Sequence, residues 1–154
     1  MTGRSNVPHP EERPEGASRR THHTFPLRVY YEDTDAAGIV YHANYLKFAE
    51  RGRSEMLRSF GFGHRRLGGE DGVGFAVRRC SVDYLAPARL EDALTVDTTL
   101  GDIGAATLSV RQQIRRDGEL LADLDILVAC IGRDGRPRRL PSALRAFLAE
   151  ARAP

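Results

Sequence analysis

The sequence predicts an α+β domain in which a five-stranded antiparallel sheet wraps around one long central helix. Its length of 154 residues suffices for one domain with a real core. One long segment repeats apolar residues at steps of three and four, which is typical of an amphipathic helix. Four apolar segments separated by short turns follow it, which indicates a meander of strands. A single helix and a meander bury their apolar faces most simply against each other.

The first residues of the chain are polar and rich in proline. Residues 1–24 hold three prolines, two glycines and mixed charges, which predicts a disordered N-terminal tail. The folded domain is therefore expected over residues 25–152. Its first strand is predicted over Leu27–Tyr31, and Glu32–Tyr41 is predicted to be a loop because it holds two aspartates and a glycine.

The central helix is predicted from Ala43 to Phe60. Gly52 lies in the middle of its apolar stripe, where it costs about 1 kcal/mol relative to alanine, so we expect the helix backbone to approach the sheet closely there. Leu46 and Leu57 fall beside the stripe and suggest a self-associating surface, with exposure in a monomer as the alternative. The stripe consists of Tyr45, Phe48, Ala49, Gly52, Met56 and Phe60.

The second half of the chain predicts the rest of the sheet. Two glycines end the central helix, and residues 64–72 are polar and glycine-rich, hence a predicted loop. A short terminal helix is predicted from Pro141 to about Ala151, because proline is favoured at the first helical position. The four strands, each followed by proline, glycine or aspartate, are expected over Val73–Leu85, Ala93–Leu100, Ala105–Arg115 and Leu120–Ile131.

Composition excludes several functional classes. With 23 basic and 21 acidic residues the net charge is +2, which argues against a dedicated nucleic-acid binder. No apolar run is long enough to span a bilayer and no signal-peptide pattern is visible. Cys80 and Cys130 lie in apolar segments and are predicted to be buried free thiols of a cytoplasmic protein. His22 and His23 stand without a third ligand, so no metal site is predicted.

The loop before the central helix contains the candidate catalytic residues. Taken singly, Asp33 or Asp35 would close a turn or cap a helix, and His42 would be an ordinary helix-start residue. Together, Asp35 and the helix start seven residues later combine a carboxylate with unpaired backbone N–H groups and a partial positive charge. A carboxylate facing such donors can attack a polarised carbonyl or activate water against it.

The same loop resembles a known family. The matching residues are similar to the signature of the 4-hydroxybenzoyl-CoA thioesterase family, which has the hot-dog fold. The histidine after the tyrosine makes the chain most similar to the Tol-Pal-associated acyl-CoA thioesterase branch. The resemblance covers about residues 25–147. It is carried by Arg28-Val29, Thr34-Asp35, Gly38-Ile39-Val40-Tyr41, His42, Asn44-Tyr45, Asp83-Tyr84-Leu85, Pro87-Ala88-Arg89 and Asp134-Gly135-Arg136-Pro137.

The resemblance implies a homodimer or homotetramer that hydrolyses acyl-CoA, or acyl carrier protein, thioesters without a metal or cofactor. The family's catalytic aspartate falls on Asp35, as nucleophile or as general base, and these two roles stay open. Its backbone oxyanion donor falls on the N–H of His42, whose imidazole would be the second catalytic group. Asp33 does not match the catalytic position and is expected to be structural.

The remaining candidates would bind substrate. Glu50, on the helix shoulder, is either a pocket residue or part of a surface pair. Arg133 and Arg136 belong to a cluster after the last strand that suits CoA phosphates, although a solvated charge run explains it too. Four residues of the loop and the first helical turn would shape the acyl pocket: Gly38, Val40, Tyr41 and Tyr45. For Tyr45, packing in the core is the alternative.

Two other functions compete with hydrolysis. A hot-dog hydratase would place its Asp and His closer together with Asn-Pro between them, and that pattern is absent. A non-catalytic hot-dog protein that binds acyl-CoA, or a scaffold protein, is the other alternative. No pair of DNA-binding helices flanks the domain, which weighs against a ligand-sensing regulator.

Overall fold

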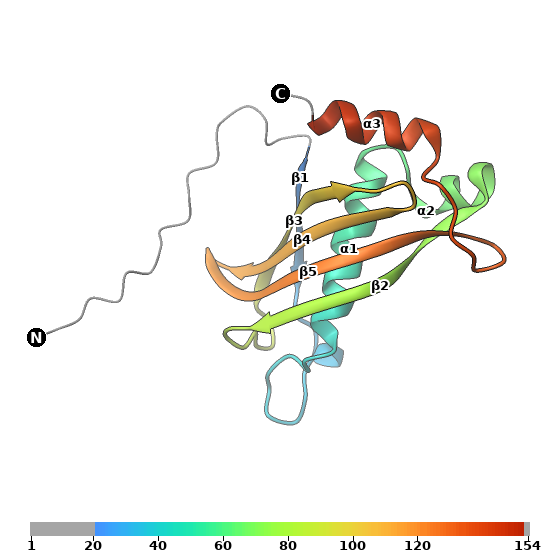
Figure 1. Cartoon of the computed structure of the whole chain (residues 1–154). Helices are drawn as coiled ribbons and strands as arrows, with labels where there is room; N and C mark the ends of the chain where they lie inside the picture. The colour runs from blue at the N-terminus through green and yellow to red at the C-terminus, as the bar shows by residue number, and fades with distance from the viewer. Residues whose placement is uncertain (1–20, 153–154) are drawn as a thin grey trace, which may run out of the picture.

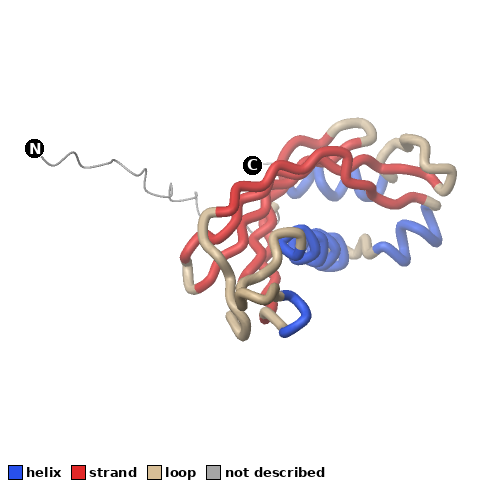
Figure 2. The backbone as a smooth tube through the Cα atoms, turned by 90° about the horizontal axis from the view of Figure 1, so that it is seen from below, coloured by secondary structure: helices blue, strands red, loops and turns tan. Residues whose placement is uncertain are grey.

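The computed structural model describes residues 21–152, so residues 1–20 and 153–154, and with them most of the expected tail, lie outside the described residues. One antiparallel sheet with strand order β1-β3-β4-β5-β2 curves around helix α1 (Asn44–Ser59), as expected (Figures 1 and 2). The other main elements are β1 (His22–Arg28), β2 (Val73–Tyr84), β3 (Ala93–Ile103), β4 (Thr107–Arg116), β5 (Glu119–Gly132) and α3 (Ser142–Arg152).

The first strand differs from its prediction. It begins at His22, inside the expected tail, and ends at Arg28, three residues before the predicted end. Its pairing with β3, from His22 opposite Thr99 to Arg28 opposite Ala93, supplies backbone hydrogen bonds that the local composition does not reveal. The residues after it turn into a short 3₁₀ helix, η1 (Tyr31–Asp33), which starts the loop that leads to α1.

The segment after α1 is not the irregular loop predicted over residues 64–72. It contains one helical turn, α2 (His64–Arg66), and a π-turn, η2 (Leu67–Asp71). Leu67 is fully buried and holds this segment to the core. Because the neighbouring residues are polar or glycine, the sequence shows only one apolar contact and no helical period.

Helix α1 lies against the concave face of the sheet (Figure 2). A Cβ atom built on Gly52 would come within 2.6 Å of the Val96 side chain, which confirms the expected close approach. Leu57, predicted to flank the buried stripe, is instead core, with 4% of its surface exposed. Leu46 keeps 42% exposure, so only this part of the predicted shoulder faces outward.

A fully buried glutamine fixes the position of α1 relative to the sheet. Gln112 on β4 donates from Nε2 to the Ala49 carbonyl at 2.8 Å and to Thr98 Oγ1 at 2.9 Å. Its Oε1 accepts from Arg53 Nη1 at 3.0 Å. Every polar atom of the buried amide is thereby used at least once, which avoids the desolvation cost of an unpaired group.

Strand β2 forms an edge of the sheet, and this explains one wrong burial prediction. Cys130 on β5 is buried as predicted, but Cys80 on β2 is exposed, because a strand at an edge has a neighbour on one side only. Partial desolvation raises the pKa of the Cys80 thiol, so the thiol is not activated. Both cysteines are free thiols, as predicted.

Helix α3 closes the end of the sheet opposite the loop that precedes α1 (Figure 1). The Phe147 ring lies 4.8 Å from that of Phe60 and 6.0 Å from that of Phe62. Arg145 donates to the carbonyls of Gly104 and Ala105 in the turn between β3 and β4. In residues 21–152 no helix has the length and apolarity needed to cross a membrane.

The contact at Gly52 predicts a specific sensitivity. Gly52→Val adds branched bulk against Val96 and is expected to lower the free energy of unfolding by about 1–3 kcal/mol. Gly69→Ala is the control, since a Cβ there meets no atom within 4 Å, and it should change stability by less than about 0.5 kcal/mol. Urea denaturation measures both, and equal stability of the two variants would contradict the close packing.

Candidate active site

The loop between β1 and α1 folds into a tight hairpin. Thr34 and Val40 form an isolated antiparallel bridge, and the Asp35 N–H donates to the Ile39 carbonyl at 2.9 Å. The Gly38 N–H donates back to the Asp35 carbonyl at 3.0 Å, and Gly38 has φ +78°, a left-handed conformation that glycine adopts without steric cost. The hairpin therefore presents Asp35 at its tip.

The two acids of this loop have different environments. Asp33 is buried, and its Oδ2 accepts from the Tyr30 N–H at 2.7 Å, so it is structural, as expected. Asp35 is exposed, and its Oδ1 accepts from the Ala37 N–H at 2.8 Å, which forms an Asx-turn. This bond holds the carboxylate in place and leaves its second oxygen facing solvent.

The start of α1 offers a free donor. Across residues 21–152 the His42 N–H has no hydrogen-bond partner, whereas the Asn44 N–H donates to the Tyr41 carbonyl at 2.8 Å. The Asp33 carbonyl accepts both from the Tyr41 N–H at 3.0 Å and from Asn44 Nδ2 at 2.8 Å. These bonds tie the aspartate-bearing hairpin to the first turn of the helix.

The His42 side chain lies between two tyrosines. Its ring centroid is 4.5 Å from that of Tyr41 and 6.3 Å from that of Tyr84, at the end of β2. The Tyr84 hydroxyl donates to the His42 carbonyl at 2.9 Å. Desolvation, and then the nearby Cys80 and Tyr45, raise the pKa of Tyr84, which keeps this hydroxyl protonated as a donor. Sequence reasoning did not select Tyr84 as a site residue.

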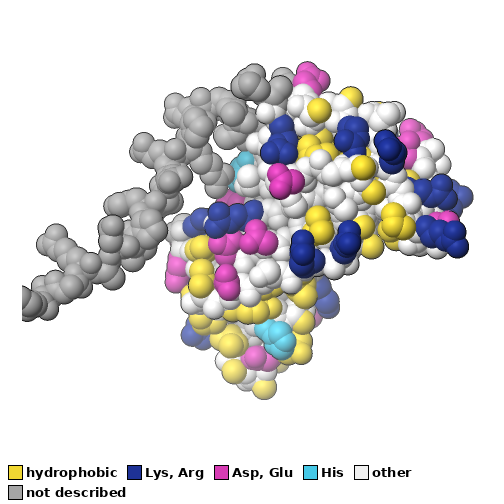
Figure 3. All heavy atoms as spheres, in the orientation of Figure 1, with side chains coloured by type: hydrophobic (Ala, Val, Ile, Leu, Met, Phe, Trp, Pro, Cys, Tyr) yellow, Lys and Arg dark blue, Asp and Glu magenta, His cyan; other side chains and the backbone are white. Residues whose placement is uncertain are grey.

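The predicted pocket residues of the loop divide into two groups. Gly38 and Tyr41 are exposed beside Asp35. Val40 and Tyr45 are buried, and the Tyr45 hydroxyl accepts from the Ala88 N–H at 2.9 Å. Val40 and Tyr45 thus pack in the core beneath the exposed residues of the loop. For Tyr45 this agrees with core packing, the alternative to a role in the acyl pocket. In Figure 3, hydrophobic surface gathers at the lower end of the molecule, where Figure 1 places this loop.

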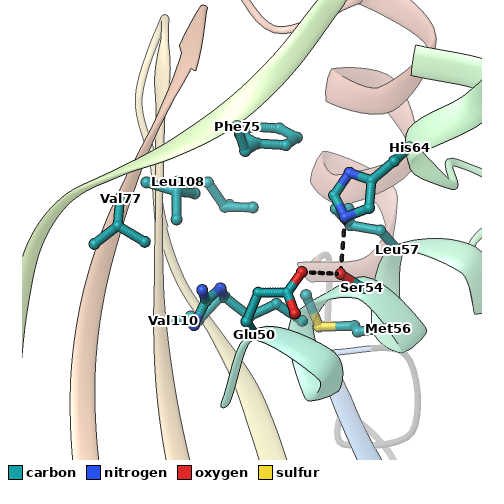
Figure 4. A pocket seen from close by; sticks show the side chains of 11 residues that line it. Glu50, Ser54, Met56, Leu57, His64, Phe75, Val77, Leu108 and Val110 are labelled. Carbon is teal, nitrogen blue, oxygen red and sulfur yellow. Dashed lines mark hydrogen bonds between the residues drawn. The ribbon is translucent and has the colours of Figure 1, made fainter. Parts of the chain in front are cut away.

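Glu50 lines a groove between α1 and the edge of the sheet. One hollow lies between Leu46, Glu50 and Arg53 of α1 and residues of β2 and β5. A second, deeper cavity of about 70 Å³ shares Glu50 and Arg53 with it and continues under Phe75 (Figure 4). Its remaining walls are Ser54, Met56, Leu57, His64, Val77, Leu108, Val110 and Val128.

Three polar side chains form one wall of the deeper cavity. Ser54 Oγ donates to Glu50 Oε1 at 3.2 Å and lies 2.8 Å from His64 Nε2 (Figure 4). Glu50 and Ser54 are four residues apart and so share a helix face, a signal that the sequence did contain. His64 gave no such signal, because only the folded chain brings α2 back to α1.

Arg53 separates the polar wall from the sheet. Its Nη1 donates to Gln112 Oε1 at 3.0 Å, and the guanidinium lines both hollows. Burial lowers the pKa of Arg53, and the charges of Glu50 and Cys80 oppose that shift. Because an arginine pKa is so far above neutral, the group stays charged.

The structure does not bring the predicted phosphate-binding arginines to Asp35 within one chain. Arg133 and Arg136 follow β5, whose end pairs with Val73 at the start of β2. The loop before α1 instead contacts Tyr84, at the end of β2, through the His42 carbonyl. The 12 residues from Val73 to Tyr84 span 11 residue steps, or about 36 Å of strand. Arg133 Nη2 donates to the Gly68 carbonyl at 3.0 Å.

The part of the chain that the structure describes contains no cluster of three or more His, Cys, Asp or Glu side chains able to hold a metal ion. The candidate site offers a carboxylate, an imidazole and a backbone donor, namely Asp35, His42 and the His42 N–H. This set can supply nucleophilic or general-base catalysis together with stabilisation of a developing oxyanion.

The chain is similar to known proteins. A family model described as thioesterase-like superfamily matches residues 29–148. The chain is 44% identical over 122 residues to the acyl-CoA thioester hydrolase YbgC of Escherichia coli O6:H1, covering 78% of this chain and 90% of that protein. It is 43% identical over 108 residues to the acyl-CoA thioesterase YbgC of Haemophilus influenzae, covering 70% of this chain and 79% of that protein. The crystal structure of a probable thioesterase from Bartonella henselae has a TM-score of 0.75 and 38% identity, covering 78% of this chain and 99% of that one.

The link between the hairpin and the helix start can be tested through Asn44. Asn44→Ala removes the bond to the Asp33 carbonyl and is expected to lower the free energy of unfolding by about 1–2 kcal/mol. The Tyr41 amide, which donates to the same carbonyl, should exchange its hydrogen faster. Tyr31→Ala, at an exposed position of the loop, is the control. Unchanged exchange at Tyr41 in the Asn44 variant would show that the two segments are held independently.

Proposed function

We propose that this chain, which belongs to the thioesterase-like superfamily and is an acyl-CoA thioesterase with the hot-dog fold, hydrolyses its substrate with Asp35 and the first turn of α1. The observation that carries the proposal is the unpaired His42 N–H at a helix start, with an exposed carboxylate on the adjoining hairpin. A thioester carbonyl placed between them meets a donor on its oxygen and a carboxylate near its carbon.

The donor would act on the oxyanion. As the carbonyl carbon becomes tetrahedral, negative charge develops on its oxygen, and the His42 N–H would donate to it with help from the positive end of α1. One such donor typically contributes about 3 kcal/mol to transition-state stabilisation. The Tyr84 hydroxyl and the Asn44 amide hold the backbone that carries this donor.

The free oxygen of Asp35 would act in one of two ways. As a nucleophile it forms a mixed anhydride and expels the CoA thiolate, after which water hydrolyses the anhydride. As a general base it takes a proton from water while the water oxygen attacks the carbonyl. In either case the leaving sulfur needs a proton, and the exposed His42 imidazole, beside Tyr41, would supply or relay it.

Asp35→Asn should abolish turnover at every acyl chain length. The amide is neither a strong nucleophile nor a base, so kcat should fall by about 10²–10⁴-fold. Glu32→Gln, which neutralises another exposed acid of the same loop, is the control and should keep its rate. A thiol-release assay with a coloured disulfide reagent measures both. Undiminished hydrolysis by the Asp35 variant would remove this residue from the mechanism.

The site of one chain is open, and we propose that a second copy completes it. Asp35 and His42 are exposed, whereas substrate sites bury most of their ligand. The neighbouring edge strand β2 has unpaired backbone groups along 12 residues and exposes Val77 and Tyr84 by 52% and 48%. Antiparallel pairing of two β2 strands would cover both features and give the homodimer, or the pair of dimers, that we expect.

This pairing would also give the arginines a role. In an antiparallel pair the start of one β2 lies beside the end of the other, so Arg133 and Arg136 of the second copy would approach the Asp35 loop. Their planar guanidinium groups suit the phosphates of CoA. Each site would then combine the carboxylate of one chain with the phosphate contacts of its partner.

A mixing experiment tests the shared site. The Arg133→Ala, Arg136→Ala double variant should show a raised KM for acyl-CoA and an unchanged KM for the pantetheine thioester, which lacks the nucleotide phosphates. Mixed with Asp35→Asn and re-associated from denaturant, it should regain wild-type KM, because one of the two sites in each heterodimer then carries no substitution. If the arginines act within their own chain, the mixture will show no such recovery.

We also place the protein in the cytoplasm, where acyl-CoA is available. Both cysteines are free thiols, Cys80 on the surface and Cys130 in the core. Exposed free thiols such as that of Cys80 persist in a reducing compartment, where glutathione and thioredoxin oppose oxidation. The acyl group could also arrive on acyl carrier protein, and the pantetheine comparison above separates the two carriers, because only CoA offers an adenosine phosphate.

A further inference from the structure

The groove between α1 and β2 is lined from Leu46, about one helical turn after His42, to Ser54. Along it, residues of the two elements face each other in opposite chain directions. Tyr84 contacts His42 at the start of the helix, Cys80 lies across the hollow from Leu46, and Phe75 lies across the cavity from Ser54. The shallow hollow and the deeper cavity therefore follow α1 away from His42, and Figure 4 shows the cavity between Glu50 and Ser54 of the helix and Phe75 of β2.

We propose that this groove holds the acyl chain of the substrate, that it selects a straight aliphatic chain, and that His64 sets the longest chain accepted. The proposal rests on the thioester lying between Asp35 and the His42 N–H. It adds to that mechanism the chemical class of the acyl group and a residue that determines specificity.

The shape of the deeper cavity favours a thin chain. Its volume of about 70 Å³ is roughly half that of the engineered 150 Å³ apolar cavity that holds one benzene molecule. Apart from the polar wall and Arg53, every side chain around it is apolar: Met56, Leu57, Phe75, Val77, Leu108, Val110 and Val128. The end of a methylene chain fits this space, and an aromatic ring does not.

The polar wall closes the cavity at its far end. His64 is exposed on its outer side and lines the cavity on its inner side, so it separates the cavity from solvent. Its Nε2 is held 2.8 Å from Ser54 Oγ, which in turn donates to Glu50. A chain that extends further would have to break this contact and place methylene groups against the unpaired polar atoms, which is unfavourable.

The helix gives the expected chain length. From His42 to Ser54 the backbone advances 12 residues, or about 18 Å at 1.5 Å per residue. An extended chain of tetrahedral atoms advances about 1.25 Å per bond, so about 14 carbons reach the wall. A second copy paired along β2 would roof the shallow hollow at Leu46 and leave the deeper cavity, which lies between α1 and the sheet, for the acyl end.

The test is the kcat/KM of the full-length chain for saturated acyl-CoA esters of 4 to 18 carbons, with benzoyl-CoA alongside. For the wild type, each buried methylene should raise kcat/KM by up to about fourfold, until a maximum near 14 carbons. His64→Ala opens the wall and should move the maximum to longer chains, raising the ratio of 18-carbon to 12-carbon activity about tenfold. Ser54→Ala should move it in the same direction by less.

Matched variants separate specificity from stability. Arg65→Ala changes the neighbour of His64 in the chain. Arg65 lines no wall of the cavity, so this variant should keep the wild-type chain-length profile. Ser59→Ala is the control for Ser54→Ala. It removes a serine hydroxyl at the end of α1, away from the cavity walls, and should also keep the wild-type chain-length profile. Phe75→Ala enlarges the cavity from its opposite wall and must also favour longer chains, whether or not the His64 variant folds well. Butyryl-CoA, too short to reach the cavity, should be hydrolysed at the wild-type rate by the Arg65 and Ser59 variants.

Two results would overturn the proposal. One is a chain-length profile that neither His64→Ala nor Phe75→Ala changes, and the other is a higher kcat/KM for benzoyl-CoA than for every aliphatic ester. Both are compatible with an inactive Asp35→Asn variant, in which case the mechanism stands and only the assignment of the groove fails. Conversely, full activity of Asp35→Asn would disprove the mechanism whatever the chain-length profile.

Discussion

The depth at which α1 packs into the sheet decides where the functional groups lie. Gly52 lets the helix backbone come into contact with Val96, and Gln112 joins the helix to two strands through a fully used buried amide. A larger residue at position 52 would push the helix away from the sheet. An apolar residue at position 112 would remove the hydrogen bonds that fix the helix along the sheet. With this contact in place, the first turn of α1 ends up at the rim of the sheet, where substrate can reach it.

The loop before α1 converts that position into a site. Its hydrogen bonds converge on the Asp33 carbonyl, which accepts from both the hairpin and the helix start. Tyr84 connects the same helix start to the end of β2. The edge strand therefore contacts the candidate site, borders the groove that we propose for the acyl chain and offers the surface on which we propose that a second copy pairs, so all three proposals depend on one element.

Much of the fold could be predicted because its signals are local. The apolar stripe of α1 and the turn residues between strands depend only on neighbours in the chain, and their predicted bounds differ from the structure by a few residues. The exceptions are instructive. His22–Thr24 join the sheet through pairing with β3, and residues 64–72 become helical through the burial of Leu67. Both effects come from contacts with distant segments.

The sequence by itself determined the loop that carries Asp35, the start of the central helix just after His42 and the apolar stripe that buries the helix, because turn chemistry and periodicity act over a few residues. Only the tertiary structure decided that Tyr84 supports the helix start and that His64 meets Ser54. It also decided that Arg133 and Arg136 lie far from Asp35 in the same chain. These relations join residues from different elements, and chain folding brings such residues together, or keeps them apart, through packing that no local pattern encodes.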